Sequence, residues 1–157
     1  MSNSDTEDPS VRVNRIMATL EKNVLAIGRM EFSKEEYDLS FSAGTVRTPL
    51  GIVKISEHQF EKMSEKKRKG FFSAMYLTLS DPIIILHDIR FSEERQEKEE
   101  SRIYIKSIRK LWDLKISYMI SVVVIIYGIA ISISNGPRER NRIIELIKST
   151  NNILYEK

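Results

Sequence analysis

One histidine, two cations and a serine stand where they could bind a phosphate and move a proton. His58 comes at the expected start of a helix, directly after a predicted strand, and imidazole readily gains and loses a proton near neutral pH. Lys106 alternates with Ile105 on a second strand, so we expect it on the side away from the core, where it could bind a phosphate. Arg138 begins the last predicted helix, whose first turn favours anions. These three and Ser134 are the candidate catalytic residues, and an exposed position without function is the alternative for each.

A second group of polar residues could hold a substrate around these four. Some stand beside a Pro-Leu-Gly turn or in the strand after it, and the others lie on a predicted β-hairpin, where they could hydrogen-bond an anion. His87 follows an apolar strand, and we interpret it as a surface residue. The candidate substrate-binding residues are Arg47, Thr48, Lys54, Ser121, Ser132 and Asn135.

The composition argues against several kinds of site. The 157 residues include no cysteine and two histidines, which excludes disulfides and thiolate metal sites and makes a multi-histidine metal centre improbable. The sequence has no glycine-rich phosphate loop, no nucleophile elbow and no metalloprotease helix motif. We therefore expect neither a metal nor a cofactor.

Charge is distributed unevenly along the chain, whose net charge is +3. Residues 93–100 are rich in glutamate, whereas residues 66–69 and 102–115 are rich in lysine and arginine. Basic segments set apart from acidic ones suit a polyanionic partner such as RNA. An ordinary solvated surface is the alternative interpretation of each segment.

Residues 116–137 contain no charged side chain and are long enough to span a membrane as a helix. Their apolar residues are almost all valine and isoleucine, which favour strands, and Tyr127-Gly128 divides them into halves of strand length. We expect a β-hairpin and no membrane contact, and keep a single-span membrane protein using residues 116–134 as an alternative. The N-terminus shows no cleavable signal peptide, so we expect a cytoplasmic location, in the producing cell or in a target cell.

The hairpin interpretation also fixes a register, because a two-residue turn pairs the strand residues outward from it. One face would then be an apolar wall for a helix to cover, formed by Ile129, Ile131 and Ile133. The expected opposite pairs are Ile126 with Ile129, Val123 with Ser132, and Ser121 with Ser134.

The remaining elements follow from hydrophobic periodicity and turn signals, and helices followed by a β-meander make an α+β domain. We expect one compact unit over residues 41–157, preceded by an N-terminal tail and helix over residues 1–40. The expected elements are helices at 11–30, 57–79 and 138–147, short strands within 45–55, strands at 83–86 and 103–106, and the hairpin at 117–134.

Two runs of this sequence resemble a known class of nucleases. They are residues 44–55 with the following His58 and Phe60, and residues 131–138 with Asn141-Arg142-Ile143-Ile144 and Leu154-Tyr155. The chain resembles, over about residues 40–157, the barnase–EndoU–colicin–RelE-like nucleases of phage-type polymorphic toxins, which often follow phage head-morphogenesis modules.

This resemblance implies N-terminal helices packed on a four-stranded antiparallel β-meander, with a short C-terminal helix. It also implies a toxin-type endoribonuclease that works without a metal: a base activates the ribose 2′-hydroxyl, which attacks the adjacent phosphate and leaves a 2′,3′-cyclic phosphate. The implied partners are RNA, with transfer RNA as one candidate, and an acidic immunity protein. Asn135-Gly136 stands where the class often has a histidine, so a non-catalytic RNA-binding member is the alternative.

Overall fold

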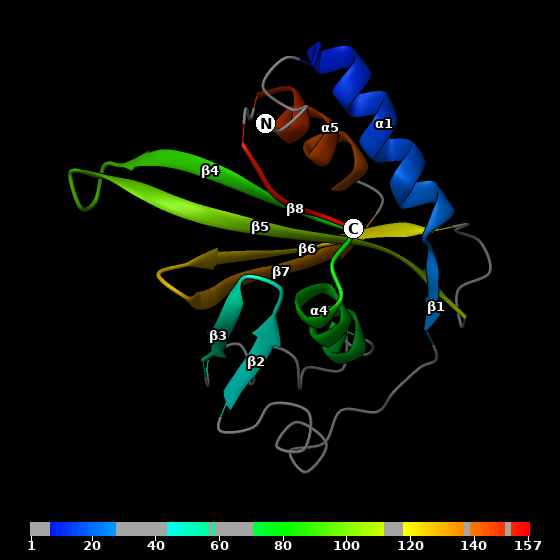
Figure 1. Cartoon of the computed structure of the whole chain (residues 1–157). Helices are drawn as coiled ribbons and strands as arrows, with labels where there is room; N and C mark the ends of the chain where they lie inside the picture. Colours follow the sequence, from blue (N-terminus) through cyan, green and yellow to red (C-terminus); the bar gives the residue numbers. More distant parts are fainter. Residues whose placement is uncertain are drawn as a thin grey trace.

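The computed structural model of the chain describes residues 7–27, 44–56, 58, 71–111, 118–136, 139–149 and 152–157. In these ranges α1 and α5 lie on one side of a sheet, and α4 lies on the other side with the β2–β3 hairpin (Figure 1). The elements are α1 (Pro9–Lys22), β1 (Leu25–Ile27), β2 (Thr45–Thr48), β3 (Gly51–Ile55), α4 (Phe71–Ser80), β4 (Ile84–Ser92), β5 (Glu97–Lys110), β6 (Met119–Ile126), β7 (Ile129–Gly136), α5 (Glu139–Ser149) and β8 (Ile153–Glu156).

The sheet has the strand order β2-β3-β7-β6-β5-β4-β8, with β1 beside the end of β5. The strands β4 to β7 form an antiparallel meander, whereas β3 with β7 and β1 with β5 are parallel pairs. The sheet is therefore eight-stranded, mixed and curled, and the expected four-stranded antiparallel meander is wrong. Segments from both ends of the chain extend the meander, because β8 pairs with β4 and the β2–β3 hairpin pairs with β7. The α+β class itself agrees with the structure.

The first helix is shorter than the sequence predicts. Asp8 caps its start, since the carboxylate accepts a hydrogen bond of 2.8 Å from the Ser10 amide. The expected helix at 11–30 is wrong in its second half, because α1 ends at Lys22 and Leu25–Ile27 form β1. These three residues have apolar side chains that fit either structure, and a partner strand in β5 decides between them. Of the predicted helix at 57–79, residues 57 and 59–70 lie outside the described residues.

The predicted β-hairpin around Tyr127-Gly128 is confirmed. Tyr127 and Gly128 have φ angles of 52° and 74°, as a type I′ turn requires, and Ile126 pairs with Ile129 as expected. Farther from the turn the register shifts, because Ile131 is an extra residue that forms a β-bulge in β7. Among the described residues every helix is too short or too polar to span a bilayer, and strands occupy the alternative membrane span. The expected pairs Val123–Ser132 and Ser121–Ser134 are therefore wrong, and the observed pairs are Val123–Ile133 and Ser121–Asn135.

The expected apolar wall on β7 is also wrong. Ile129 and Ile131 are 39% and 44% exposed, whereas Ala130 between them is buried. Ala130 faces the side covered by α4 and the β2–β3 hairpin. The other side of the hairpin is covered by α1 and α5 farther from the turn, so the isoleucines next to the turn remain accessible.

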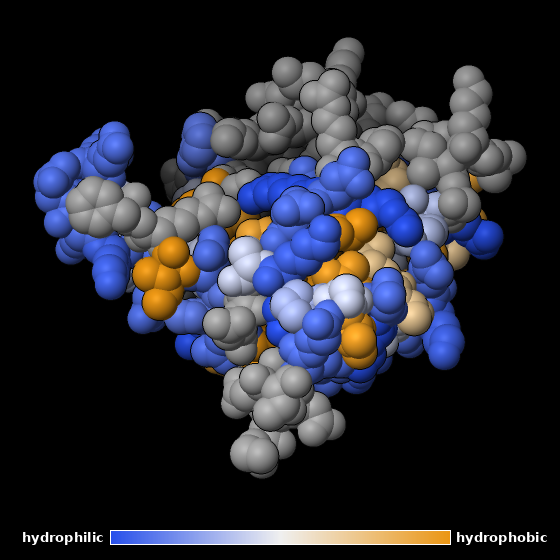
Figure 2. Space-filling view, turned by 90° about the horizontal axis from the view of Figure 1, so that it is seen from above, coloured by the Kyte–Doolittle hydropathy of each residue, from blue (hydrophilic) through white to orange (hydrophobic). Residues whose placement is uncertain are grey.

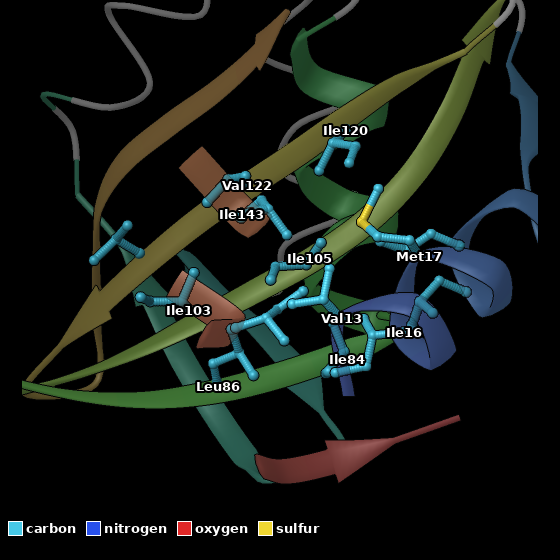
Figure 3. Close-up of a cluster of buried hydrophobic side chains, with 14 residues drawn as sticks. Val13, Ile16, Met17, Ile84, Leu86, Ile103, Ile105, Ile120, Val122 and Ile143 are labelled. Carbon is cyan, nitrogen blue, oxygen red and sulfur yellow. The ribbon is translucent and has the colours of Figure 1, made fainter. Parts of the chain in front are cut away.

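Two apolar layers stabilise the sheet, one on each side. Figure 3 shows Val13, Ile16 and Met17 of α1 pointing toward strand residues that include Ile84 and Ile105. Strand β5 is buried on both faces over residues 103–108, as expected for a strand between two layers. Seen from the side of α1 and α5, the described surface is mostly hydrophilic, with apolar side chains in small groups (Figure 2). The hollow side of the curled sheet is the opposite one, which faces α4 and the β2–β3 hairpin (Figure 1).

Candidate functional site

A cleft of about 690 Å³ lies on the hollow side of the curled sheet. The β2–β3 hairpin crosses this side and is fixed to β5 by a buried 2.9 Å hydrogen bond between the Thr48 and Tyr104 hydroxyls. The cleft is lined by apolar side chains from the hairpin, β6 and β8, which are Leu50, Ile52, Val53, Ile125 and Leu154. Its polar lining residues are His87, Lys98, Glu100, Arg102, Tyr127 and Asn152, with Gly128 beside Tyr127.

The charged residues of the cleft come from one face of two paired strands. Lys98, Glu100 and Arg102 alternate along β5 and so point to the same side of the sheet. His87 of β4 lies opposite Arg102 in the antiparallel register. Its Nε2 atom is 3.8 Å from Oε2 of Glu100, so a protonated His87 forms an ion pair with that carboxylate. An imidazole and a carboxylate are therefore adjacent at the cleft wall.

Two cations of the cleft have no acidic partner in the described part of the chain. Lys98 and Arg102 are both exposed, and no described carboxylate lies within ion-pair distance of either one. The single carboxylate lining the cleft, Glu100, is the neighbour of His87. The cleft thus offers more positive charge than its own acids neutralise, which favours an anionic ligand.

Comparison with family models, curated proteins and solved structures finds no match to this chain. The resemblance to phage-type nuclease toxins therefore stays a prediction, and function is inferred from the cleft itself. In the described ranges no three His, Asp or Glu side chains are grouped as metal ligands.

Lys106, a candidate catalytic residue, is 2% exposed and lies under α4. Its Nζ atom donates to the carbonyl of Asp81 at 2.5 Å and to the Asp81 carboxylate at 3.0 Å, just after the end of α4. The expectation that Lys106 lies away from the core is wrong, because α4 covers that face of β5. Burial lowers the pKa of Lys106, since the hydrogen bond and charge of Asp81 only partly offset the lost hydration.

For the pKa of Asp81, hydrogen bonds outweigh burial, whereas burial prevails for Lys106. Burial alone would raise the pKa of its carboxyl, yet hydrogen bonds from Lys106 and Lys157 outweigh this and hold the pKa below its usual value. The carboxylate is half exposed and has two cations, whereas Lys106 is enclosed and has one acid, so both pKa values are lowered. Lys106 therefore joins α4 to the sheet and is enclosed away from solvent.

Ser121 and Asn135 continue the row that begins at Lys106 across β6 and β7. The backbone register thus brings three of the predicted site residues together. Ser121 is fully buried and hydrogen-bonds with the Thr78 hydroxyl of α4 at 2.9 Å, and Thr78 also bonds to the Ala74 carbonyl. Since α4 covers this row, a substrate has no access to Ser121 or Lys106 in this structure.

The other predicted residues are spread over the molecule. Thr48 is buried, and its hydroxyl is hydrogen-bonded to Gly51 and Leu50 of its own turn as well as to Tyr104, while Arg47 and Lys54 are exposed. His58 is exposed, and Arg138 lies outside the described residues. Ser132 and Ser134 pair with Val124 and Val122, at strand positions on the α5 side of the sheet.

Sequence reasoning missed the charged group of the cleft. The alternation of Lys98, Glu100 and Arg102 was a usable signal, because residues two apart on a strand share a face. It was hidden because the predicted strands covered only residues 83–86 and 103–106, whereas β4 extends to Ser92 and β5 begins at Glu97. His87 was interpreted as a surface residue, and only the register with β5 places it beside Arg102.

Proposed function

We propose that the protein is a metal-independent endoribonuclease that binds RNA in this cleft. The observation that carries the proposal is the combination of an adjacent imidazole and carboxylate, His87 and Glu100, with two cations that have no acidic partner among the described residues. The cleft volume of about 690 Å³ is in the usual range for small-ligand pockets, so one nucleotide unit of a strand fits. The resemblance noted in the sequence supports the same activity. We propose that this activity takes place in a cytoplasm.

The reaction assigned to the cleft uses the RNA's own hydroxyl as the nucleophile. Glu100 accepts the proton of the ribose 2′-hydroxyl while the 2′-oxygen forms a bond to the adjacent phosphorus. The bond from phosphorus to the 5′-oxygen breaks, and a protonated His87 gives its proton to that oxygen. The products are a 2′,3′-cyclic phosphate and a 5′-hydroxyl. Lys98 and Arg102 stabilise the extra negative charge on the phosphate oxygens.

This assignment keeps the reaction expected from the sequence but transfers it to other residues. His58, Ser134 and Arg138 have no part in it, and Lys106 holds α4 against the sheet. An acidic immunity protein remains part of the proposal, since a carboxylate-rich surface could cover Lys98 and Arg102.

A non-catalytic RNA-binding protein is the second candidate. It is favoured by the high exposure of the Glu100 side chain, 73%, because a carboxylate surrounded by water is poorly oriented as a base. In this case the two cations would bind RNA and leave it intact.

The experiment is incubation of purified protein with total RNA in EDTA, followed by detection of 2′,3′-cyclic phosphate ends. We expect His87→Ala to slow cleavage at least about 100-fold and Arg102→Ala at least about tenfold. Arg109→Ala is the matched control, because Arg109 is an exposed arginine of the same strand outside the cleft. His58→Ala discriminates between the cleft and the assignment made from the sequence.

The outcomes separate the candidates. Intact RNA, together with binding that weakens steeply with salt and with Arg102→Ala, would favour the non-catalytic protein. Cleavage that survives His87→Ala but is lost in His58→Ala would overturn the assignment to this cleft. If the protein neither cleaves nor binds RNA, both candidates are overturned.

A further inference from the structure

We infer that Tyr127 is a stacking platform for an unpaired base of the RNA, so that the protein acts on single-stranded segments. The inference rests on the proposed function, because the phosphate next to that base is the one bound by the cations of the cleft. Tyr127 lines the same cleft as Lys98 and Arg102. The register that pairs Ile126 with Ser101 places the turn beside the part of β5 that carries them.

The backbone at Tyr127 does not favour a tyrosine. Its φ of 52° is in the left-handed region, where a bulky side chain is uncommon and where asparagine or glycine is the usual choice at this position of a type I′ turn. Backbone strain of this kind concentrates at binding sites, where another requirement selects the residue. Burial in the core does not supply that requirement, because Tyr127 is 62% exposed.

Neighbouring side chains nevertheless hold the tyrosine ring in a defined position. The guanidinium carbon of Arg95 lies 5.6 Å from the ring centroid, and Arg95 in turn is 3.5 Å from the Glu99 carboxylate. The Tyr127 hydroxyl donates a hydrogen bond of 3.3 Å to the Glu97 carboxylate. All of these partners come from the β4–β5 hairpin. A largely exposed aromatic ring, on a residue that also lines the cationic cleft, is suited to stacking on a base.

This arrangement selects the substrate class. Bases in a duplex are already stacked on each other, so they reach an aromatic side chain only when they are unpaired. A stretch of unpaired RNA can place one base on Tyr127 and the adjacent phosphate between Lys98 and Arg102. Loops and single-stranded tails are therefore preferred over helical RNA.

The test uses a short 2′-O-methyl RNA oligonucleotide, which binds without being cleaved, in three forms: single-stranded, annealed to its complement, and abasic. We expect Tyr127→Asn to weaken binding of the single strand about five- to hundredfold and to leave the already weak abasic binding unchanged. Asparagine tolerates the left-handed backbone, so the melting temperature of Tyr127→Asn should be no lower than that of the native protein. It should be higher by about 2–4 °C where the relief of strain exceeds the loss of the Tyr127 contacts. Tyr127→Trp keeps an aromatic ring and should restore the affinity.

A matched control is Gln96→Asn. Gln96 also has a positive φ, 53°, in the neighbouring β4–β5 turn but does not line the cleft, so this variant should gain stability without losing affinity. Unchanged binding of the single strand by Tyr127→Asn, or a loss that Tyr127→Trp shares, would overturn the platform. If Arg102→Ala still abolishes binding of the single strand in that case, only the stacking role of Tyr127 is overturned and the proposed function is unaffected. If Arg102→Ala leaves the binding of all three RNA forms unchanged, the proposed function itself is overturned.

Discussion

Replacement of Lys106 by methionine separates a structural role of this lysine from a role at a substrate phosphate. The ammonium is enclosed between β5 and the end of α4 and donates to both the carbonyl and the carboxylate of Asp81. Methionine has a similar length and no charge, so it keeps most of the packing and removes both hydrogen bonds. Lys106→Ala removes the packing as well.

The magnitudes follow from these contacts. Leaving a buried carbonyl without its donor costs about 1–3 kcal/mol. The Asp81 carboxylate is half exposed and keeps its contact with Lys157, so the loss of its ion pair with Lys106 costs about 1 kcal/mol or less. Removal of the buried charge offsets part of this cost. We expect Lys106→Met to lower the free energy of unfolding by about 1–2 kcal/mol and Lys106→Ala by about 3–5 kcal/mol, since each lost methylene adds ~0.8 kcal/mol.

The assay is urea unfolding of both variants, followed by RNA cleavage under conditions where both remain folded. Under the proposed function, we expect the methionine variant to cleave RNA within about threefold of the native rate, because an enclosed ammonium contributes little to a reaction elsewhere. A methionine variant that is as stable as the native protein but has lost cleavage would refute the reasoning. Lys106 would then be a phosphate ligand that becomes accessible when α4 moves.

Three further changes test the buried polar contacts and the pH dependence. Arg12→Met should cost about 2–3 kcal/mol by urea unfolding, because Arg12 is 2% exposed and donates to the Ile147 carbonyl at the end of α5; a cost below that of the same change at a surface arginine would contradict this. Thr78→Val should cost about 1–2 kcal/mol, and adding Ser121→Ala should recover part of it, whereas simple additivity would argue against their hydrogen bond. The pKa of Asp81 is lowered on folding, so its charge stabilises the protein above its ordinary value of 3.8, and this stability is lost as pH falls through the lowered value. Asp81→Asn should therefore be less stable than the native protein near neutral pH, and this difference should shrink as pH falls through the lowered pKa of Asp81; a difference that stays constant into acid would count against the ion pairs.

Local signals in the sequence predicted the elements whose turns are short. Tyr127-Gly128 and the Pro-Leu-Gly turn gave both hairpins, because two-residue turns join strands that are adjacent in the chain. The same signals could not place β8 or β1, which pair with strands far away in the sequence. The bulge at Ile131 was equally hidden, since one isoleucine among several carries no mark of an extra residue.

The candidate site was harder to predict, because it depends on which face each helix covers. Lys106 was interpreted as a phosphate ligand from strand alternation alone, and the alternation was right. Helix α4 covers that position, and Asp81, directly after the helix, pairs with Lys106, so the lysine is enclosed and not free to bind a phosphate. Conversely, His87 and Glu100 have little in common as separate sequence positions, and the β4–β5 register makes them neighbours.

Helix α1 completes its packing with α5, which follows far later in the sequence. Val13 and Ile16 share one apolar layer with Ile143 and Ile147 of α5, and the wall of the cleft includes Asn152 and Leu154. During synthesis α1 leaves the ribosome well before α5 and keeps its apolar stripe in water until α5 follows. A chain that stops before α5 and β8 lacks both this layer and one wall of the cleft, so the cleft is complete only after residue 154 has been synthesised.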